Sequence, residues 1–264
     1  MQILCKEVFM KKYKRKVFCL LSFLLSIFLI LPASAAGASF SWYCPHVKNH
    51  VQPSTGSELL FAETLDGYYL DHSGEKVIYL TFDAGYENGN VAKVLDVLKE
   101  NDVPGAFFIL GNLITRNPEL VVRMIDEGHT VCNHTVHHRD MSKVSGEELL
   151  TELHELEALY AKTTGKELAK FYRPPEGRFS KENLETLKNA GYKTIFWSFA
   201  YPDWDNNRQV NPEKAKQVIL ENAHPGEVML LHPTSSTNAS ILDSVIKELK
   251  EMGYRFGRLE ELTK

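Results

Sequence analysis

The stretch VIYLTFDAGYENG, residues 77–89, decides the fold prediction for this chain. Its first six residues, Val77–Phe82, are apolar or β-branched without alternation, which is typical of a strand that is buried on both faces. Polar residues begin at Asp83, and apolar residues at helical spacing then predict a helix over residues 90–101. A buried strand followed by a helix is the repeating unit of a parallel α/β fold.

The same unit recurs along the rest of the chain. Short apolar runs predict further strands at Ala106–Leu110, Thr130–Cys132, Phe171–Arg173, Lys193–Phe199, Val228–Leu231 and Arg255–Leu259. Helical spacing and cap residues predict helices over residues 118–127, 146–164, 180–190, 212–222 and 241–252. This alternation predicts one parallel α/β domain, and it is compatible with both a closed barrel and an open doubly wound sheet.

Composition and charge exclude several classes of protein. Hydrophobic residues make up 44% of the 264 residues and charged residues 24%, as in ordinary globular proteins. The formal net charge of -4 gives no reason to expect a nucleic-acid partner. No glycine-rich phosphate loop follows the first predicted strand, so we expect no nucleotide ligand.

Residues 1–35 predict export from the cytoplasm. A basic region, an uncharged apolar run and the small-residue pattern ASA at 33–35 together indicate a signal peptide. An uncleaved anchor is the alternative, and it would be the only contact of the chain with a membrane. Residues 36–75 are predicted to form an irregular, aromatic arm, and residues 76–264 the single domain.

Two cysteines, Cys44 and Cys132, follow the predicted signal peptide. They allow one disulfide bond or two free thiols, and the sequence leaves both open. Either way the domain depends on an apolar core for its stability.

Reactive side chains follow five of the predicted strands. Because the carboxyl ends of parallel strands meet at one edge of the sheet, these side chains predict a single active site. They are Asp83 after the first strand, His134, His137 and His138 after the third, Arg173 and Glu176 after the fourth, Asp203 and Trp204 after the fifth, and His232 after the sixth.

The histidines suggest a metal site. His134 and His138 are four residues apart, so a helical turn would bring both imidazoles to one side, where they can hold a metal ion. His137 is a competing ligand, and a solvated polar loop is the alternative to a metal site. Hydrolytic metal sites usually have three protein ligands, and a carboxylate at the end of the first strand would supply the third.

Asp83 and His232 are the candidates for acid–base chemistry. Asp83 ends an apolar strand and can take a proton from water, while an ion pair with Arg173 would keep it ionised. His232 can protonate a leaving group, and Asp203 can raise the pKa of its imidazole. The alternatives are a structural ion pair and a packed histidine. The predicted apolar wall of the pocket consists of Trp204 and Leu230.

Five segments, in this order, resemble the five motifs of the polysaccharide deacetylases, carbohydrate esterase family 4, also called the NodB homology domain. The segments are TFDAGYENG (81–89), NHTVHH (133–138), RPPEGRFS (173–180), YPDW (201–204) and LLHP (230–233). The resemblance covers about residues 75–262 and implies a distorted seven-stranded (β/α) barrel. It is strongest to the branch of peptidoglycan N-acetylmuramic acid deacetylases that make the δ-lactam of spore cortex.

The resemblance implies metal-assisted hydrolysis of an N-acetyl group and a role for each motif residue. The implied roles are Asp83 as the base, Arg173 as its partner, His134 and His138 as metal ligands, the Glu176 N–H as oxyanion donor, Asp203 as the residue that tunes the acid, and His232 as the general acid. The implied cofactor is a divalent ion such as zinc, cobalt or manganese.

Three positions depart from the family pattern. Ala84 stands where relatives usually carry a metal-binding aspartate, so we expect a weakly held metal unless Tyr86 or Glu87 reaches the site. Glu176 replaces a common aromatic residue, and Ala200 replaces a common aspartate.

The expected function is removal of N-acetyl groups from N-acetylmuramic acid in a peptidoglycan glycan strand, in the cell wall or the forespore envelope. Two alternatives remain open. One is a deacetylase of another glycan, such as peptidoglycan N-acetylglucosamine, chitin-like oligomers or acetylated xylan. The other is a non-catalytic binder of cell-wall glycan.

Overall fold

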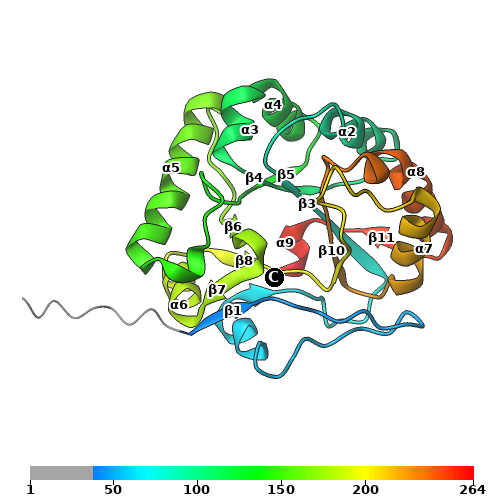
Figure 1. The fold of residues 1–264 in the computed structure, drawn as a ribbon, viewed down its shortest axis with the longest axis horizontal. Coiled ribbons are helices and arrows are strands. Elements are labelled where there is room, and N and C mark those ends of the chain that lie inside the picture. Colours follow the sequence, from blue (N-terminus) through cyan, green and yellow to red (C-terminus); the bar gives the residue numbers. More distant parts are fainter. Residues whose placement is uncertain (1–37) are drawn as a thin grey trace, which may run out of the picture. The chain divides into compact units, whose positions relative to one another are not determined.

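A computed structural model describes residues 38–264, and the predicted signal peptide lies outside the described residues. Helices surround a curled nine-stranded sheet (Figure 1). The strands are β1 (Ser39–Ser41), β2 (Gly67–Tyr68), β3 (Val77–Ala84), β4 (Ala106–Ile109), β5 (Thr130–Asn133), β6 (Phe171–Tyr172), β7 (Arg178–Ser180), β8 (Lys193–Ile195), β9 (Phe199–Ala200), β10 (Glu227–Leu231) and β11 (Arg255–Phe256). The helices are α2 (Val91–Glu100), α3 (Gly111–Arg116), α4 (Pro118–Asp126), α5 (Gly146–Thr164), α6 (Lys181–Asn189), α7 (Pro212–Asn222), α8 (Ser236–Glu251) and α9 (Leu259–Leu262), with 3₁₀ turns η1 (Leu60–Leu65), η2 (Met141–Lys143) and η3 (Pro175–Gly177).

The large sheet is parallel and closes on itself. Its order is β2-β8-β6-β5-β4-β3-β10-β9, with β11 beside β3. One continuous segment, residues 193–200, supplies both β8, which pairs with β6, and β9, which pairs with β10. The sheet therefore curls into a distorted barrel, which confirms the predicted fold class rather than an open doubly wound sheet.

The junction between β8 and β9 is the seam of the barrel. Phe196 donates its backbone N–H to Tyr68, next to β8, whereas Ser198 donates to Val228 in β10. The prediction of one strand over Lys193–Phe199 is therefore wrong, because the backbone changes partners between residues 196 and 198.

Alternation along β3 sorts its side chains between the two faces of the barrel wall. Leu80 and Phe82 point outward into the apolar cluster formed with α2 and α8. Val77 and Tyr79 belong to the inner cluster. Asp83 also points inward, and because it lies near the end of β3 its carboxylate reaches the mouth of the barrel.

The predicted helices are present, and most of their ends lie within one residue of the expected positions. The last long helix, α8, starts at Ser236 rather than at 241, because the Ser235 side chain accepts the Asn238 N–H and caps the helix earlier. Helix α3 has no counterpart in the prediction, and α9 replaces the end of the predicted strand Arg255–Leu259. Within residues 38–264, no helix has the length and apolar character needed to cross a bilayer.

The arm is more regular than predicted and covers the seam. Strand β1 pairs antiparallel with β7, and β2 joins the large sheet beside β8. The Trp42 ring stacks on Phe196 with centroids 4.1 Å apart, and its indole N–H donates to the Trp197 carbonyl at 2.9 Å. Cys44 in the arm and Cys132 in β5 are buried free thiols, so they form no disulfide with each other.

We expect Trp42→Ala to lower the free energy of unfolding by about 3–5 kcal/mol, because it leaves a cavity beside the seam. Urea unfolding followed by circular dichroism measures this change. Tyr43→Ala is the matched control: the Tyr43 side chain is exposed, so its loss should change stability by no more than about 0.5 kcal/mol. An equal loss of unfolding free energy in the two variants would show that the Trp42 contact does not stabilise the seam.

Candidate active site

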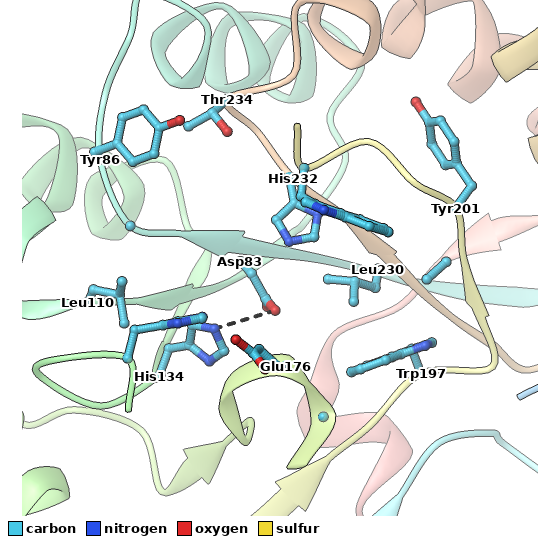
Figure 2. A pocket seen from close by; sticks show the side chains of 15 residues that line it. Asp83, Tyr86, Leu110, His134, Glu176, Trp197, Tyr201, Leu230, His232 and Thr234 are labelled. Atoms are coloured by element: carbon cyan, nitrogen blue, oxygen red, sulfur yellow. Dashed lines mark ion pairs between the residues drawn. The ribbon is translucent and has the colours of Figure 1, made fainter. Parts of the chain in front are cut away.

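A cavity of about 780 Å³ opens where the barrel strands end (Figure 2). The predicted site residues that line it are Asp83, His134, His138, Glu176, Trp204, Leu230 and His232. The two remaining predicted residues, Arg173 and Asp203, are buried behind this lining, and each binds a residue of the wall. The structure thus brings the whole predicted set together.

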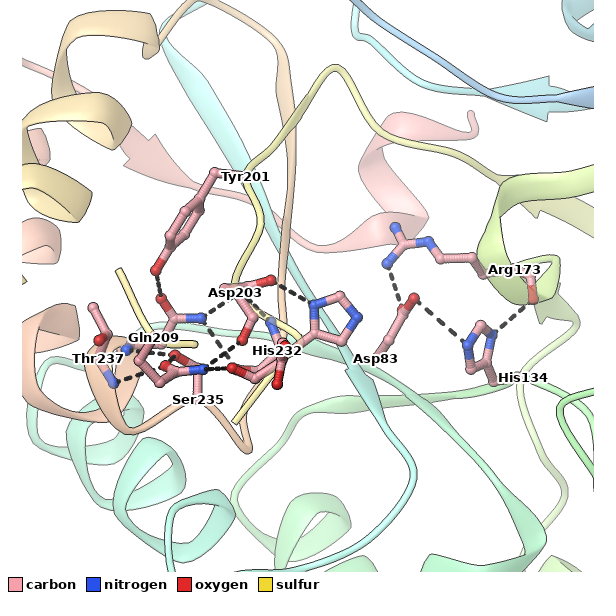
Figure 3. A network of polar contacts seen from close by, with 11 residues as sticks. Asp83, His134, Arg173, Tyr201, Asp203, Gln209, His232, Ser235 and Thr237 are labelled. Carbon is pink, nitrogen blue, oxygen red and sulfur yellow. Dashed lines mark hydrogen bonds and ion pairs between the residues drawn. The ribbon is translucent and has the colours of Figure 1, made fainter. Parts of the chain in front are cut away.

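Arg173 is fully buried and donates hydrogen bonds in several directions. Its Nη1 donates to Asp83 Oδ1 at 2.8 Å (Figure 3). Its Nη2 donates to Thr81 Oγ1 at 2.9 Å. Its Nε donates to the Ile195 carbonyl at 3.0 Å, and Nη2 also reaches the Phe196 carbonyl at 3.2 Å. Burial alone would raise the pKa of Asp83, but the Arg173 charge brings that pKa below its usual value. Asp83 is therefore ionised at neutral pH.

A second charged pair holds His232. Its Nδ1 donates to Asp203 Oδ1 at 2.7 Å, and its backbone N–H donates to Asp203 Oδ2 at 2.8 Å. Asn238, in the first turn of α8, donates to Asp203 Oδ2 at 2.6 Å and fixes the carboxylate. Burial alone would lower the pKa of His232, but Asp203, with a smaller contribution from Asp83, raises it above its usual value.

His134 and His138 lie in a tight loop rather than in the predicted helical turn. Thr135 and His138 adopt φ values of 74° and 55°, and the His138 N–H donates to Thr135 Oγ1 at 3.0 Å. This left-handed backbone is uncommon for residues other than glycine. It brings the His134 and His138 rings edge to face, with centroids 5.1 Å apart.

Glu152, on α5, holds this loop from behind. Its carboxylate accepts the backbone N–H groups of Val136 and His137 at 3.2 Å each, and His137 Nδ1 at 2.9 Å. Arg139 also donates to it at 2.8 Å. His137 is thus bound to Glu152 and does not line the cavity, which removes it as a competitor of His138.

The two remaining histidines suit a cation. His134 Nδ1 donates to the Arg173 carbonyl at 2.9 Å, and burial lowers the pKa of His134 to about 4. The ring is therefore neutral, and its Nε2 presents a lone pair. That lone pair lies 3.6 Å from Asp83 Oδ2, so two acceptors face each other. A metal ion would engage the lone pair of His134, and the imidazoles of His134 and His138 fit it as ligands.

The side chains present do not complete a three-ligand site. Ala84 is buried in the apolar cluster outside the sheet and has no donor atom. Glu87 accepts the Gly89 and Ala92 N–H groups at the start of α2, and Tyr86 Oη accepts Asn206 Nδ2. Among residues 38–264, no group of three or more His, Cys, Asp or Glu side chains is arranged to hold a metal ion. The described residues therefore offer a metal ion two imidazole ligands, and its other coordination positions have no protein side chain.

Glu176 lies in the turn η3 at the edge of the cavity. Its φ is 55°, and its carboxylate pairs with Arg178 Nε at 3.0 Å. The next residue, Gly177, also has a positive φ of 66°, and a Cβ there would lie 2.7 Å from the Trp197 ring. Only glycine fits at position 177, so the turn has one well-defined conformation.

Sequence reasoning missed three supporting residues. Thr81 opens the first motif segment but received no role, and Glu152 lies in no motif, because the importance of both comes from contacts with segments distant in the chain. Asn238 could have been found, since Ser235 is a good helix cap and would have placed Asn238 in the first turn of α8 beside His232.

Comparison with known proteins agrees with this geometry. Residues 71–195 match the sequence family described as "Polysaccharide deacetylase". The chain is 42% identical over 223 residues to the peptidoglycan-N-acetylmuramic acid deacetylase PdaA of Bacillus subtilis, covering 84% of this chain and 85% of that protein. It is 33% identical over 195 residues to a peptidoglycan-N-acetylglucosamine deacetylase of Bacillus cereus, covering 72% and 89%. The solved structure of Bacillus subtilis PdaA, described as a family 4 carbohydrate esterase, superposes with a TM-score of 0.81 at 41% identity, over 85% of this chain and 96% of that one.

We expect Glu152→Gln to lower the free energy of unfolding by about 1–3 kcal/mol, because an amide cannot accept all the N–H groups that the buried carboxylate accepts. Chemical denaturation measures the loss, and the imidazole NMR signals of His134 and His138 should shift as the loop relaxes. Glu155→Gln, an exposed change on the same helix, is the control. If both variants keep wild-type stability and spectra, Glu152 does not hold the loop.

Proposed function

Since the chain belongs to the polysaccharide deacetylase family of carbohydrate esterases, we propose that it hydrolyses the N-acetyl group of N-acetylmuramic acid in peptidoglycan. One observation carries the proposal: an ionised Asp83 and a histidine with a raised pKa, His232, line the same cavity on the neighbouring strands β3 and β10. A site that hydrolyses an amide needs both a base for the attacking water and an acid for the departing nitrogen.

Asp83 is assigned as the base. Arg173 keeps its carboxylate ionised and oriented, so Asp83 can take a proton from the water that attacks the acetamide carbonyl. The backbone N–H of Glu176, in the fixed turn η3, is assigned to donate a hydrogen bond to the oxyanion that this attack produces.

His232 is assigned as the acid. Its Nδ1 is committed to Asp203, which leaves Nε2 to give a proton to the amine nitrogen as the C–N bond breaks. The products are acetate and a sugar with a free amine. Trp204 and Leu230 are assigned to contact the substrate, since both line the cavity beside His232.

His134 and His138 are assigned as ligands of a weakly held divalent ion such as zinc, cobalt or manganese. When bound, the ion would act as a Lewis acid toward the carbonyl oxygen and help to ionise water. With two imidazole ligands, its affinity should be lower than that of a three-ligand site.

The muramic acid substrate is supported by the 42% identity to a deacetylase with that name, compared with 33% to a relative named for N-acetylglucosamine. A deacetylated muramic acid carries an amine and a lactyl carboxyl group on one sugar, so it can close to a δ-lactam, as in spore cortex. The signal-peptide pattern of residues 1–35 supports a location outside the cytoplasm, in the cell wall or forespore envelope.

A second function, binding of cell-wall glycan without catalysis, is favoured by one observation. Ala84 supplies no metal ligand, and Tyr86 and Glu87 are committed to other partners.

We expect the protein to release acetate from peptide-free peptidoglycan, with the lost acetyl group located on muramic acid by mass spectrometry. Chelation should lower the rate, and zinc, cobalt or manganese should restore it, because the two imidazoles provide a weak site. Asp83→Asn should lower kcat/KM by about 10²–10⁴-fold, whereas Asp126→Asn, an exposed carboxylate on α4, should not. Loss of acetyl groups from N-acetylglucosamine alone would identify that sugar, and not muramic acid, as the substrate. Glycan binding without any acetate release would favour the second function, a non-catalytic binder of cell-wall glycan.

We expect Asp203→Asn to move the alkaline limb of the kcat/KM–pH profile to lower pH. His232 must be protonated to act as the acid, and Asp203 raises the pKa of that imidazole. Without the carboxylate the pKa falls, so the protonated acid is lost at a lower pH. Asp205→Asn, in the same loop, should leave the limb in place. An unmoved limb in Asp203→Asn would contradict the role of His232 as the acid.

A further inference from the structure

Exposed aromatic side chains concentrate at the mouth of the cavity. Of the residues the structure describes, three exposed aromatic ones stand out: Tyr43, Tyr86 and Trp204. Tyr86 and Trp204, with 43% and 62% of their surfaces exposed, both line the cavity, whereas Tyr43 does not. Large apolar surfaces held in water at the edge of a pocket are typical of binding sites.

The loops that carry the two rings follow the strands on either side of the one that leads to the proposed acid. Tyr86 follows β3 and Trp204 follows β9, and these strands are the two neighbours of β10, which leads to His232. The Trp204 ring lies edge to face with His232, with centroids 6.4 Å apart. A sugar positioned at His232 would therefore lie near both of the loops that carry these rings.

The Tyr86 side chain is hydrogen-bonded to the neighbouring loop. Its hydroxyl oxygen accepts Asn206 Nδ2 at 2.5 Å, which joins the loop after β3 to the loop that carries Trp204. The base of its own loop is fixed because Asn88 and Asn90 both donate to the Thr234 carbonyl, at 2.9 and 3.0 Å. A hydrogen bond that restricts an exposed side chain reduces the conformational entropy that the side chain loses on binding.

We propose that Tyr86 binds the sugar next to the one that is deacetylated, so that the site recognises a glycan strand rather than a single sugar. This assignment rests on the proposed function. The C–H face of a pyranose ring is apolar and can cover the exposed face of Tyr86, which removes both surfaces from water. The Tyr86 hydroxyl hydrogen remains available, because the hydroxyl oxygen acts as the acceptor toward Asn206.

The test compares glycans of two and six sugars prepared from peptide-free peptidoglycan. The wild-type protein should have a higher kcat/KM for acetate release from the longer glycan. Tyr86→Ala should reduce this preference by about tenfold, the size expected for one lost ring contact. Tyr86→Phe keeps the ring and loses only the hydroxyl, so it should retain most of the preference. Tyr43→Ala, an exposed ring outside the cavity, should retain all of it.

Calorimetric binding of the six-sugar glycan provides a readout that does not need catalysis. If the wild type releases no acetate, the proposed function fails, but an approximately tenfold weaker binding by Tyr86→Ala would still support the subsite. Unchanged length preference and unchanged binding in Tyr86→Ala would overturn the proposal. An equal loss in Tyr86→Phe would also overturn it, since the hydroxyl rather than the ring face would then be responsible.

Discussion

The buried ion pair between Arg173 and Asp83 is the interaction on which the rest of the structure depends. Moving a guanidinium out of water costs several kcal/mol unless charges and hydrogen-bond acceptors replace the water. Arg173 finds them on β3, at Asp83 and Thr81, and at the seam, in the carbonyls of Ile195 and Phe196. One side chain from the end of β6 therefore spans the interior of the barrel, orders the seam and keeps the proposed base ionised.

The second charged pair, Asp203 and His232, favours the protonated form of its titratable group, whereas the first pair favours the ionised carboxylate. Asp203 raises the pKa of His232, whereas Arg173 lowers the pKa of Asp83. The cavity thus holds a carboxylate that stays ionised and an imidazole that favours its proton, which is the combination that acid–base hydrolysis requires at one pH. Separate buried partners make this possible, because each group responds mainly to its own neighbour.

The histidine loop, residues 133–138, and the barrel seam are both held by residues that do not line the cavity. The uncommon backbone at Thr135 and His138 persists because Glu152 accepts the loop's N–H groups from behind. The seam lacks continuous strand pairing, and Trp42 of the arm covers it by stacking on Phe196. Both supports are buried contacts between segments far apart in the chain.

Local signals in the sequence were enough to predict the parallel α/β class, most helix boundaries and a set of candidate site residues that the fold gathers around one cavity, because hydrophobic periodicity, caps and strand-end motifs need no distant partner. These signals do not show that residues 193–200 form two strands with different partners, that His137 binds Glu152, or that Glu87 caps α2. These contacts appear only once the chain has folded. A polar side chain binds whichever partner the closed barrel brings within hydrogen-bond distance, and that distance depends on every strand in the sheet.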